Sequence, residues 1–154
     1  MQVTINGRTR EIDPAPLESL ATTLRDRLHL LGTKVPCERG ECGACSVLID
    51  GVPVYACLTL TSRCEGRQVV TIEGVAAEGS LHPVQQAFID HDAVQCGFCT
   101  PGQVISAVAL LAENPAPDDQ AIARAMGGNL CRCGTYPKIA AAIRSLAATG
   151  QIPS

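Results

Sequence analysis

The sequence has 154 residues, enough for one medium domain or two small ones, and with 46% hydrophobic but only 3% aromatic residues its core must be aliphatic. A formal net charge of −3, few aromatic residues and no basic run argue against nucleic-acid binding. The longest apolar runs are too short to cross a bilayer, and the first residues lack the basic-then-apolar pattern of an export signal. We therefore expect no direct membrane insertion. The expected location is the cytoplasm, or the periplasmic face of the inner membrane if a partner subunit carries the chain across.

The chain begins with the pattern of a small α+β domain. Two hairpins with type I′ turns are expected, one turning at Asn6-Gly7 and the other at Asp50-Gly51. A further strand is expected over residues 69–72. Between the hairpins, leucines at helical spacing predict one face of a helix that ends near Gly32, and these are Leu17, Leu20, Leu24 and Leu28.

Nine cysteines narrow the class of protein. A disulfide scaffold is typical of secreted chains, and it would leave an odd thiol here. Zinc is a second possibility, since pairs of cysteines two residues apart commonly hold it. A third is an iron–sulfur cluster, whose ligands are also cysteine thiolates.

The spacing of the first group of cysteines favours an iron–sulfur cluster over a zinc site. Cys37, Cys42 and Cys45 have the spacing Cys-x₄-Cys-x₂-Cys, and Cys57 follows after eleven intervening residues. This is the spacing of plant-type [2Fe–2S] ferredoxins. Three ligands within nine residues must wrap around a bulky cluster, so the intervening glycines, Gly40 and Gly43, are expected to adopt positive φ. We therefore predict a β-grasp ferredoxin domain of the plant type over residues 1–75.

Residues 76–80 are the predicted linker, and residues 81–154 are predicted to be an all-α, four-helix domain. The first helix should carry Val84 and Phe88 on one face, and the third should start at Asp118 or Asp119. The second should begin with Thr100 as N-cap, Pro101 at the first position and Gln103 closing a capping box. Val104, Ile105, Val108 and Leu111 should face inward from this second helix. The fourth helix should begin near Tyr136 and bury Ile139, Ile143 and Leu146.

A second set of four cysteines flanks two of these helix starts. Cys96 and Cys99 precede the Thr100 helix, and Cys131 and Cys133 precede the Tyr136 helix. The positive end of a helix favours a thiolate, as expected here for Cys99. The eight cysteines therefore predict two [2Fe–2S] clusters, one in each half of the chain. Cys64 is left over and is expected to be a small buried apolar residue.

The motifs together resemble the small iron–sulfur subunit of the molybdenum hydroxylases, the xanthine oxidase and aldehyde oxidoreductase family. The resemblance is carried by Cys37-x₄-Cys-Gly-Ala-Cys45, Gln95-Cys-Gly-Phe-Cys-Thr-Pro-Gly102 and Asn129-Leu-Cys-Arg-Cys133, and it covers nearly the whole chain. It implies an electron-transfer subunit that turns over no substrate alone. A large partner subunit would hold the molybdopterin cofactor, with Gln95 and Cys133 approaching the edge of its pterin. That partner would oxidise an aldehyde or an N-heterocycle.

The chain departs from the usual family pattern in two ways: Pro36 replaces a glycine, and Gly134-Thr135 reverses the usual order. The reversed order resembles isoquinoline 1-oxidoreductase and related bacterial aldehyde dehydrogenases. The electron acceptor is accordingly expected to be an FAD subunit or cytochrome c. The alternative function is that of a free-standing [2Fe–2S] ferredoxin, and the predicted second cluster domain argues against it.

Overall fold

A mixed five-stranded sheet forms the first half of the chain. The computed structural model describes residues 1–76, here called the sheet half, and residues 79–150, here called the helical half. The strands stand in the order β2-β1-β5-β3-β4, with β1 and β5 parallel and the other neighbours antiparallel. Their bounds are β1 Gln2–Ile5, β2 Arg8–Glu11, β3 Ser46–Ile49, β4 Val52–Tyr55 and β5 Gln68–Val70.

Both predicted hairpin turns are confirmed. Asn6 and Gly7 have φ of 49° and 74°, and Asp50 and Gly51 have φ of 49° and 82°, as a type I′ turn requires at both central positions. The strand expected over residues 69–72 is instead Gln68–Val70. It ends early because the side chain of Asn6 accepts a hydrogen bond from the backbone N–H of Thr71, 2.9 Å away.

The helix that covers the sheet is shorter than predicted. Helix α1 (Leu20–Thr22) continues as a π-helical turn, η1 (Thr23–Arg27). Leu20 and Leu24 are buried in the core of the sheet half, as expected. Leu17 is 83% exposed, because it precedes the N-cap residue Ser19 and so lies outside the helix. The predicted end near Gly32 is also wrong, since His29 turns the chain with φ of 56°.

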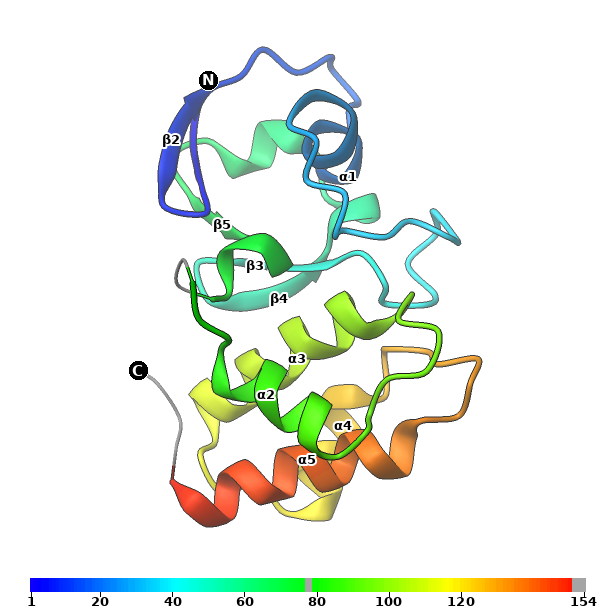
Figure 1. Ribbon diagram of the computed structural model, residues 1–154. Coiled ribbons are helices and arrows are strands. Elements are labelled where there is room, and N and C mark those ends of the chain that lie inside the picture. The colour runs from blue at the N-terminus through cyan, green and yellow to red at the C-terminus, as the bar shows by residue number, and fades with distance from the viewer. Residues whose placement is uncertain (77–78, 151–154) are drawn as a thin grey trace.

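Strand β3 is buried on both faces. Strands with antiparallel neighbours more commonly pack one face on the core and leave the other in water. Val47 and Ile49 belong to the core under α1. Ser46 and Leu48 alternate to the other face, where helix α3 runs between the sheet and the remaining helices (Figure 1). The sheet therefore packs a helix against each side of its most buried strand. Three short 3₁₀ segments complete the sheet half: η2 Ala56–Leu58, η3 Thr61–Cys64 and η4 Ile72–Gly74.

Four helices make up the helical half. They are α2 (Pro83–Asp90), α3 (Thr100–Glu113), α4 (Asp119–Met126) and α5 (Tyr136–Thr149). The predicted inward faces are confirmed, apart from Val108, which is only partly buried. The shared core contains Val84, Phe88, Val104, Leu111, Ile122, Ile139, Ile143 and Leu146. None of the described helices has the length and apolar character that a membrane crossing needs.

The predicted capping box at the start of α3 is wrong. Cys99 occupies the N-cap position without a side-chain cap, and Thr100 is already helical. Gln103 is fully buried, and its Nε2 donates to the backbone carbonyl of Asn129, 2.9 Å away. The side chain therefore bonds to a residue 26 positions along the chain instead of to the helix start.

Part of the predicted domain scheme lies outside the described residues, namely residues 77–78 of the linker and residues 151–154 at the end. The two halves have separate apolar cores. However, Ile72 and Val75 of the sheet half pack against the core of the helical half. The boundaries at 75 and 81 stay a prediction.

Candidate metal centres

The first cysteine set lies on a loop whose path depends on glycine. Gly40 and Gly43 have φ of 75° and 69°, as expected from the sequence. A Cβ on Gly40 would lie 2.3 Å from Cδ1 of Leu58, and one on Gly43 would lie 2.3 Å from the carbonyl oxygen of Gly128. The loop therefore needs glycine both for its conformation and for its close approach to the helical half.

The four sulfurs of this set fall into two pairs. The thiols of Cys37 and Cys42 lie close enough for Cys42 to affect the pKa of Cys37, and Cys57 likewise affects the pKa of Cys45. A hydrogen bond from the backbone N–H of Arg39 is the main cause that lowers the pKa of Cys37 to about 6. Burial raises the pKa of Cys45 to about 12, and the neighbouring Cys57 adds to the rise. The set thus combines one thiol that ionises readily with one that needs a metal to displace its proton.

The second set is also two pairs. Cys96 contacts Cys133, and Cys99 contacts Cys131. Burial raises the pKa of Cys99 to about 11, with further rises from Cys131. The expectation that the helix start favours a Cys99 thiolate is therefore wrong for the free thiol. Desolvation outweighs the dipole, because the sulfur is screened from water and faces other thiols.

Cys131 is the more acidic thiol of its pair. Burial raises its pKa, but hydrogen bonds from the side chain and backbone of Thr135 outweigh burial and bring that pKa down to about 7. The hydroxyl of Tyr136 also accepts from the backbone N–H of Cys131, 2.7 Å away. Gly134 has φ of 77°, so glycine fits the position where the usual family order is reversed. The reversal puts Thr135 beside the sulfur.

The paired arrangement fits a binuclear cluster. All nine cysteines lie in the described part of the chain and are free thiols, so a disulfide scaffold is not present. Among the described residues, no three His, Cys, Asp or Glu side chains converge as they would around one metal ion. A [2Fe–2S] core needs two pairs of thiolates instead, one pair for each iron. The eight cysteines match that requirement twice, although their role as ligands stays a prediction.

One edge of the second set is open to solvent. Cys96 and Cys133 are exposed, and so is Gln95, which directly precedes Cys96. Phe98 and Leu130 beside them are 50% and 54% exposed. Large apolar side chains at this edge are what a protein contact would cover.

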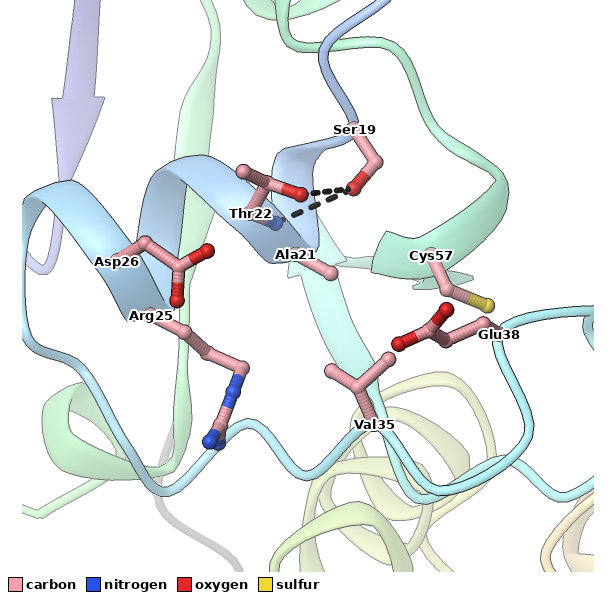
Figure 2. A pocket seen from close by; sticks show the side chains of 8 residues that line it. All are labelled: Ser19, Ala21, Thr22, Arg25, Asp26, Val35, Glu38 and Cys57. Atoms are coloured by element: carbon pink, nitrogen blue, oxygen red, sulfur yellow. Dashed lines mark hydrogen bonds between the residues drawn. The ribbon is translucent and has the colours of Figure 1, made fainter.

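A pocket of about 390 Å³ opens beside Cys57 of the first set. Figure 2 shows the Glu38 carboxylate next to the Cys57 sulfur, opposite the helix that carries Thr22, Arg25 and Asp26. Its walls are mostly polar, so it resembles a surface recess more than a small-molecule site. The lining residues are Ser19, Ala21, Thr22, Arg25, Asp26, Val35, Glu38 and Cys57.

Several residues that hold the two cysteine sets together were not singled out from the sequence. Asn129 is 3% exposed and hydrogen-bonds to both halves. Tyr55 of β4 donates its hydroxyl to the carbonyl of Gly128, 3.1 Å away. Asn129 appeared only as the first residue of a family motif, and no local pattern marks Tyr55.

Two family models match the chain. One, described as a [2Fe-2S] binding domain, matches residues 71–144. The other, described as a 2Fe-2S iron-sulfur cluster binding domain, matches residues 5–100. The first of these ranges contains the whole second cysteine set. The other contains the whole first set together with Cys96 and Cys99 of the second.

Curated relatives match over nearly the full chain. The aldehyde oxidoreductase iron-sulfur-binding subunit PaoA of Escherichia coli K12 is 44% identical, over 97% of this chain and 71% of its own length. The nicotinate dehydrogenase small FeS subunit of Eubacterium barkeri is also 44% identical, over 94% of this chain and 92% of its own.

Solved structures agree with these relatives. Quinoline 2-oxidoreductase from Pseudomonas putida 86 matches with a TM-score of 0.92 and 44% identity, over 97% of this chain and 93% of that one. Aldehyde oxidoreductase from Desulfovibrio gigas matches with a TM-score of 0.92 and 40% identity, over 99% of this chain but 18% of that one. In the second case the matched region is a small part of a much longer polypeptide.

Proposed function

Because the chain belongs to the family of iron–sulfur subunits of the molybdenum hydroxylases, we propose that its two cysteine sets each hold one [2Fe–2S] cluster. Cys37, Cys42, Cys45 and Cys57 would bind the first cluster, and the second set consists of Cys96, Cys99, Cys131 and Cys133. The observation that carries this assignment is that each set contains two pairs of thiols close enough to shift one another's pKa. The chain is an electron-transfer subunit of an oxidoreductase complex.

The chain's own residues prepare the two sites. When bound, a [2Fe–2S] cluster supplies a carrier for one electron at a time. The backbone N–H of Arg39 and the hydroxyl of Thr135 stabilise negative charge on the thiolates of Cys37 and Cys131. Burial of Cys45 and Cys99 keeps water away from the inner side of each site.

We also propose the finer architecture expected from the sequence. The mixed sheet with a helix on one face fits a β-grasp ferredoxin domain, and helices α2 to α5 fit a four-helix cluster domain. The domain bounds of 1–75 and 81–154 are part of this proposal. Two separate apolar cores support the division.

The partner is a large subunit that binds molybdopterin, with Gln95 and Cys133 facing the pterin edge. The support comes from the open edge of the second set, where Cys96, Cys133 and Gln95 are exposed beside Phe98. The substrate is an aldehyde or an N-heterocycle, since the relatives' names include both an aldehyde oxidoreductase and a nicotinate dehydrogenase.

Electrons would leave from the first set to an FAD subunit or to cytochrome c. The recess beside Cys57 supports this direction, because it brings the surface of the protein close to a proposed ligand of the first cluster (Figure 2). Its mixed charges, from Arg25, Asp26 and Glu38, suit a transient polar contact better than a permanent apolar one.

Metal analysis and co-purification test the function together. Anaerobically prepared chain should contain four irons and four acid-labile sulfides, two of each per proposed cluster. An affinity-tagged chain expressed with its neighbouring genes should retain a large subunit that contains molybdopterin. Two irons in a fully loaded preparation would contradict the two-cluster assignment, and a fully loaded chain without a partner would favour a free-standing ferredoxin.

A further inference from the structure

Helices α3, α4 and α5 border a mostly apolar recess in the helical half. Its volume is about 380 Å³, which lies within the range of small-molecule sites. Aliphatic side chains supply much of its wall: Ile122 and Met126 come from α4, and Ile139 and Ala140 come from α5. A cavity of about 150 Å³ in another protein already binds benzene. An apolar molecule of one or two rings therefore fits this recess by volume and by surface.

A buried polar atom without a partner belongs to the same wall. Gln103 of α3 lines the recess and is fully buried. Its Nε2 donates to the backbone carbonyl of Asn129, 2.9 Å away, which fixes the orientation of the amide. Its Oε1 has no hydrogen-bond partner among the described residues. A buried acceptor left unpaired is unfavourable, so this oxygen indicates a missing hydrogen-bond donor.

The charged side chains of the recess are already paired with each other. Nε of Arg144 donates to Oδ1 of Asp119, with 2.5 Å between the two atoms, and these side chains are 50% and 75% exposed. An ion pair at the rim adds no net charge that would select an anion or a cation. Tyr136 also lines the recess, and its hydroxyl is bonded to the backbone N–H of Cys131. The recess therefore suits a neutral molecule better than an ion.

We propose that this recess binds a small neutral molecule with an apolar ring and one O–H or N–H donor, of which a phenol is the simplest. The ring would pack against Ile122 and Ile139, and the donor would bond to Oε1 of Gln103. Met126 borders the same recess, and its unbranched side chain can change rotamer to let the donor reach that oxygen. The site does not rest on the assignment of the cysteines as cluster ligands.

Two fluorinated probes of the same shape test the predicted donor. 4-Fluorophenol carries a hydroxyl group where 4-fluorotoluene carries a methyl group, and fluorine NMR measures the affinity of each for the iron-loaded full-length chain. 4-Fluorophenol should bind about 3- to 10-fold more tightly, because its hydroxyl bonds to Gln103. Equal affinities would mean that a water molecule satisfies the amide oxygen, and no binding of either probe would mean that the recess is closed. Either result would overturn the proposal.

Two alanine variants of α5 test where the probes bind. Ala140→Leu fills part of the recess and should remove most of the binding of both probes. Ala148→Leu is the matched control, because Ala148 is an exposed residue of the same helix outside the recess, and its affinities should equal those of the wild type. Unchanged affinity in Ala140→Leu, or an equal loss in both variants, would place the probes elsewhere and overturn the proposal.

Gln103→Met tests the acceptor itself. Methionine is of similar length, and its sulfur is only a weak acceptor. 4-Fluorophenol should therefore lose its advantage, while 4-fluorotoluene should still bind. Gln103 also bonds to Asn129, so iron content and thermal unfolding are first compared with the wild type. A retained preference for 4-fluorophenol in the folded variant would overturn the proposal, and if this variant does not fold, the result with Ala140→Leu decides.

Discussion

The hydroxyl oxygen of Thr135 lies 3.1 Å from the sulfur of Cys131. When that sulfur is a thiolate, only the hydroxyl can donate the hydrogen bond. Thr135 is the N-cap residue of α5, but its side chain makes no capping hydrogen bond. The hydroxyl is therefore available to the sulfur, and its removal leaves the helix cap unchanged.

Removing this hydroxyl should lower the reduction potential of the second cluster. A hydrogen bond to a ligand sulfur stabilises the reduced, more negative state. One hydrogen bond of about 0.5–1.5 kcal/mol corresponds to about 20–65 mV for a one-electron couple, which is the shift expected in Thr135→Val. Redox titration of each EPR signal measures the shift. Thr135→Ser keeps a hydroxyl and should stay near wild type, and an unchanged potential in Thr135→Val would show that the contact is not felt at the cluster.

Cys64 should be dispensable for both clusters. It is fully buried in the core of the sheet half, as the sequence predicted, and burial raises the pKa of its thiol. Cys64→Ala should keep both EPR signals and cost about 1–2 kcal/mol in the free energy of unfolding, because it leaves a small cavity. Urea unfolding measures the cost. Cys57→Ala is the contrasting variant and should abolish the first signal; loss of either signal in Cys64→Ala would mean that the ligand assignment is wrong.

The stability of α2 should depend on pH through His82. Its Nδ1 accepts from the backbone N–H of Val84, 3.2 Å away, which only the unprotonated nitrogen can do. Burial lowers the pKa of His82 from its ordinary value of 6.5. The folded chain therefore binds fewer protons than the unfolded one. The contribution of unprotonated His82 to the free energy of unfolding is complete above pH 6.5, and it is lost as the pH falls through the lowered pKa.

Replacement with a cap that does not titrate tests this dependence. His82→Asn should keep a capping contribution of about 1 kcal/mol at all pH values. The difference in unfolding free energy between wild type and variant should then change between pH 8 and pH 5.5, about the range in which histidines titrate. The comparison between the two proteins cancels acid damage to the clusters, which affects both. A pH-independent difference would show that His82 does not titrate in folding.

Gln95→Ala should weaken assembly with the large subunit without loss of iron. The side chain is exposed and directly precedes Cys96, so it can reach a partner at the open edge of the second set. Loss of one interface hydrogen bond should cost about 0.5–1.5 kcal/mol in binding free energy, measured by titration of the two purified subunits. Gln86→Ala is the control, because this exposed glutamine of α2 bonds to Asp90 within its own helix. Wild-type affinity and wild-type cluster reduction in Gln95→Ala would remove Gln95 from the proposed pterin contact.

Local chemistry explains what the sequence alone could predict. The hairpin turns at Asn6-Gly7 and Asp50-Gly51 depend on adjacent residues that tolerate positive φ. The helix faces follow from apolar spacing within one element, and the cysteine spacing depends on the reach of a short loop. The failures at Leu17 and Gln103 have different causes. Leu17 lies outside the helix because the N-cap is at Ser19, and Gln103 is buried because it bonds to Asn129, 26 residues along the chain.

The connection between the two cysteine sets belongs to the tertiary structure. Asn129 and Gly43 are 86 residues apart in sequence, and neither carries a pattern that predicts their contact. The same holds for the hydrogen bond from the backbone N–H of Leu130 to the carbonyl of Cys42, since every backbone has the same donor and acceptor. The cysteine spacing was enough to predict which residues would hold iron, because that prediction depends on side-chain chemistry and on the reach of short loops. How the two sites are joined was decided only by folding, because it depends on which backbones come within hydrogen-bonding distance.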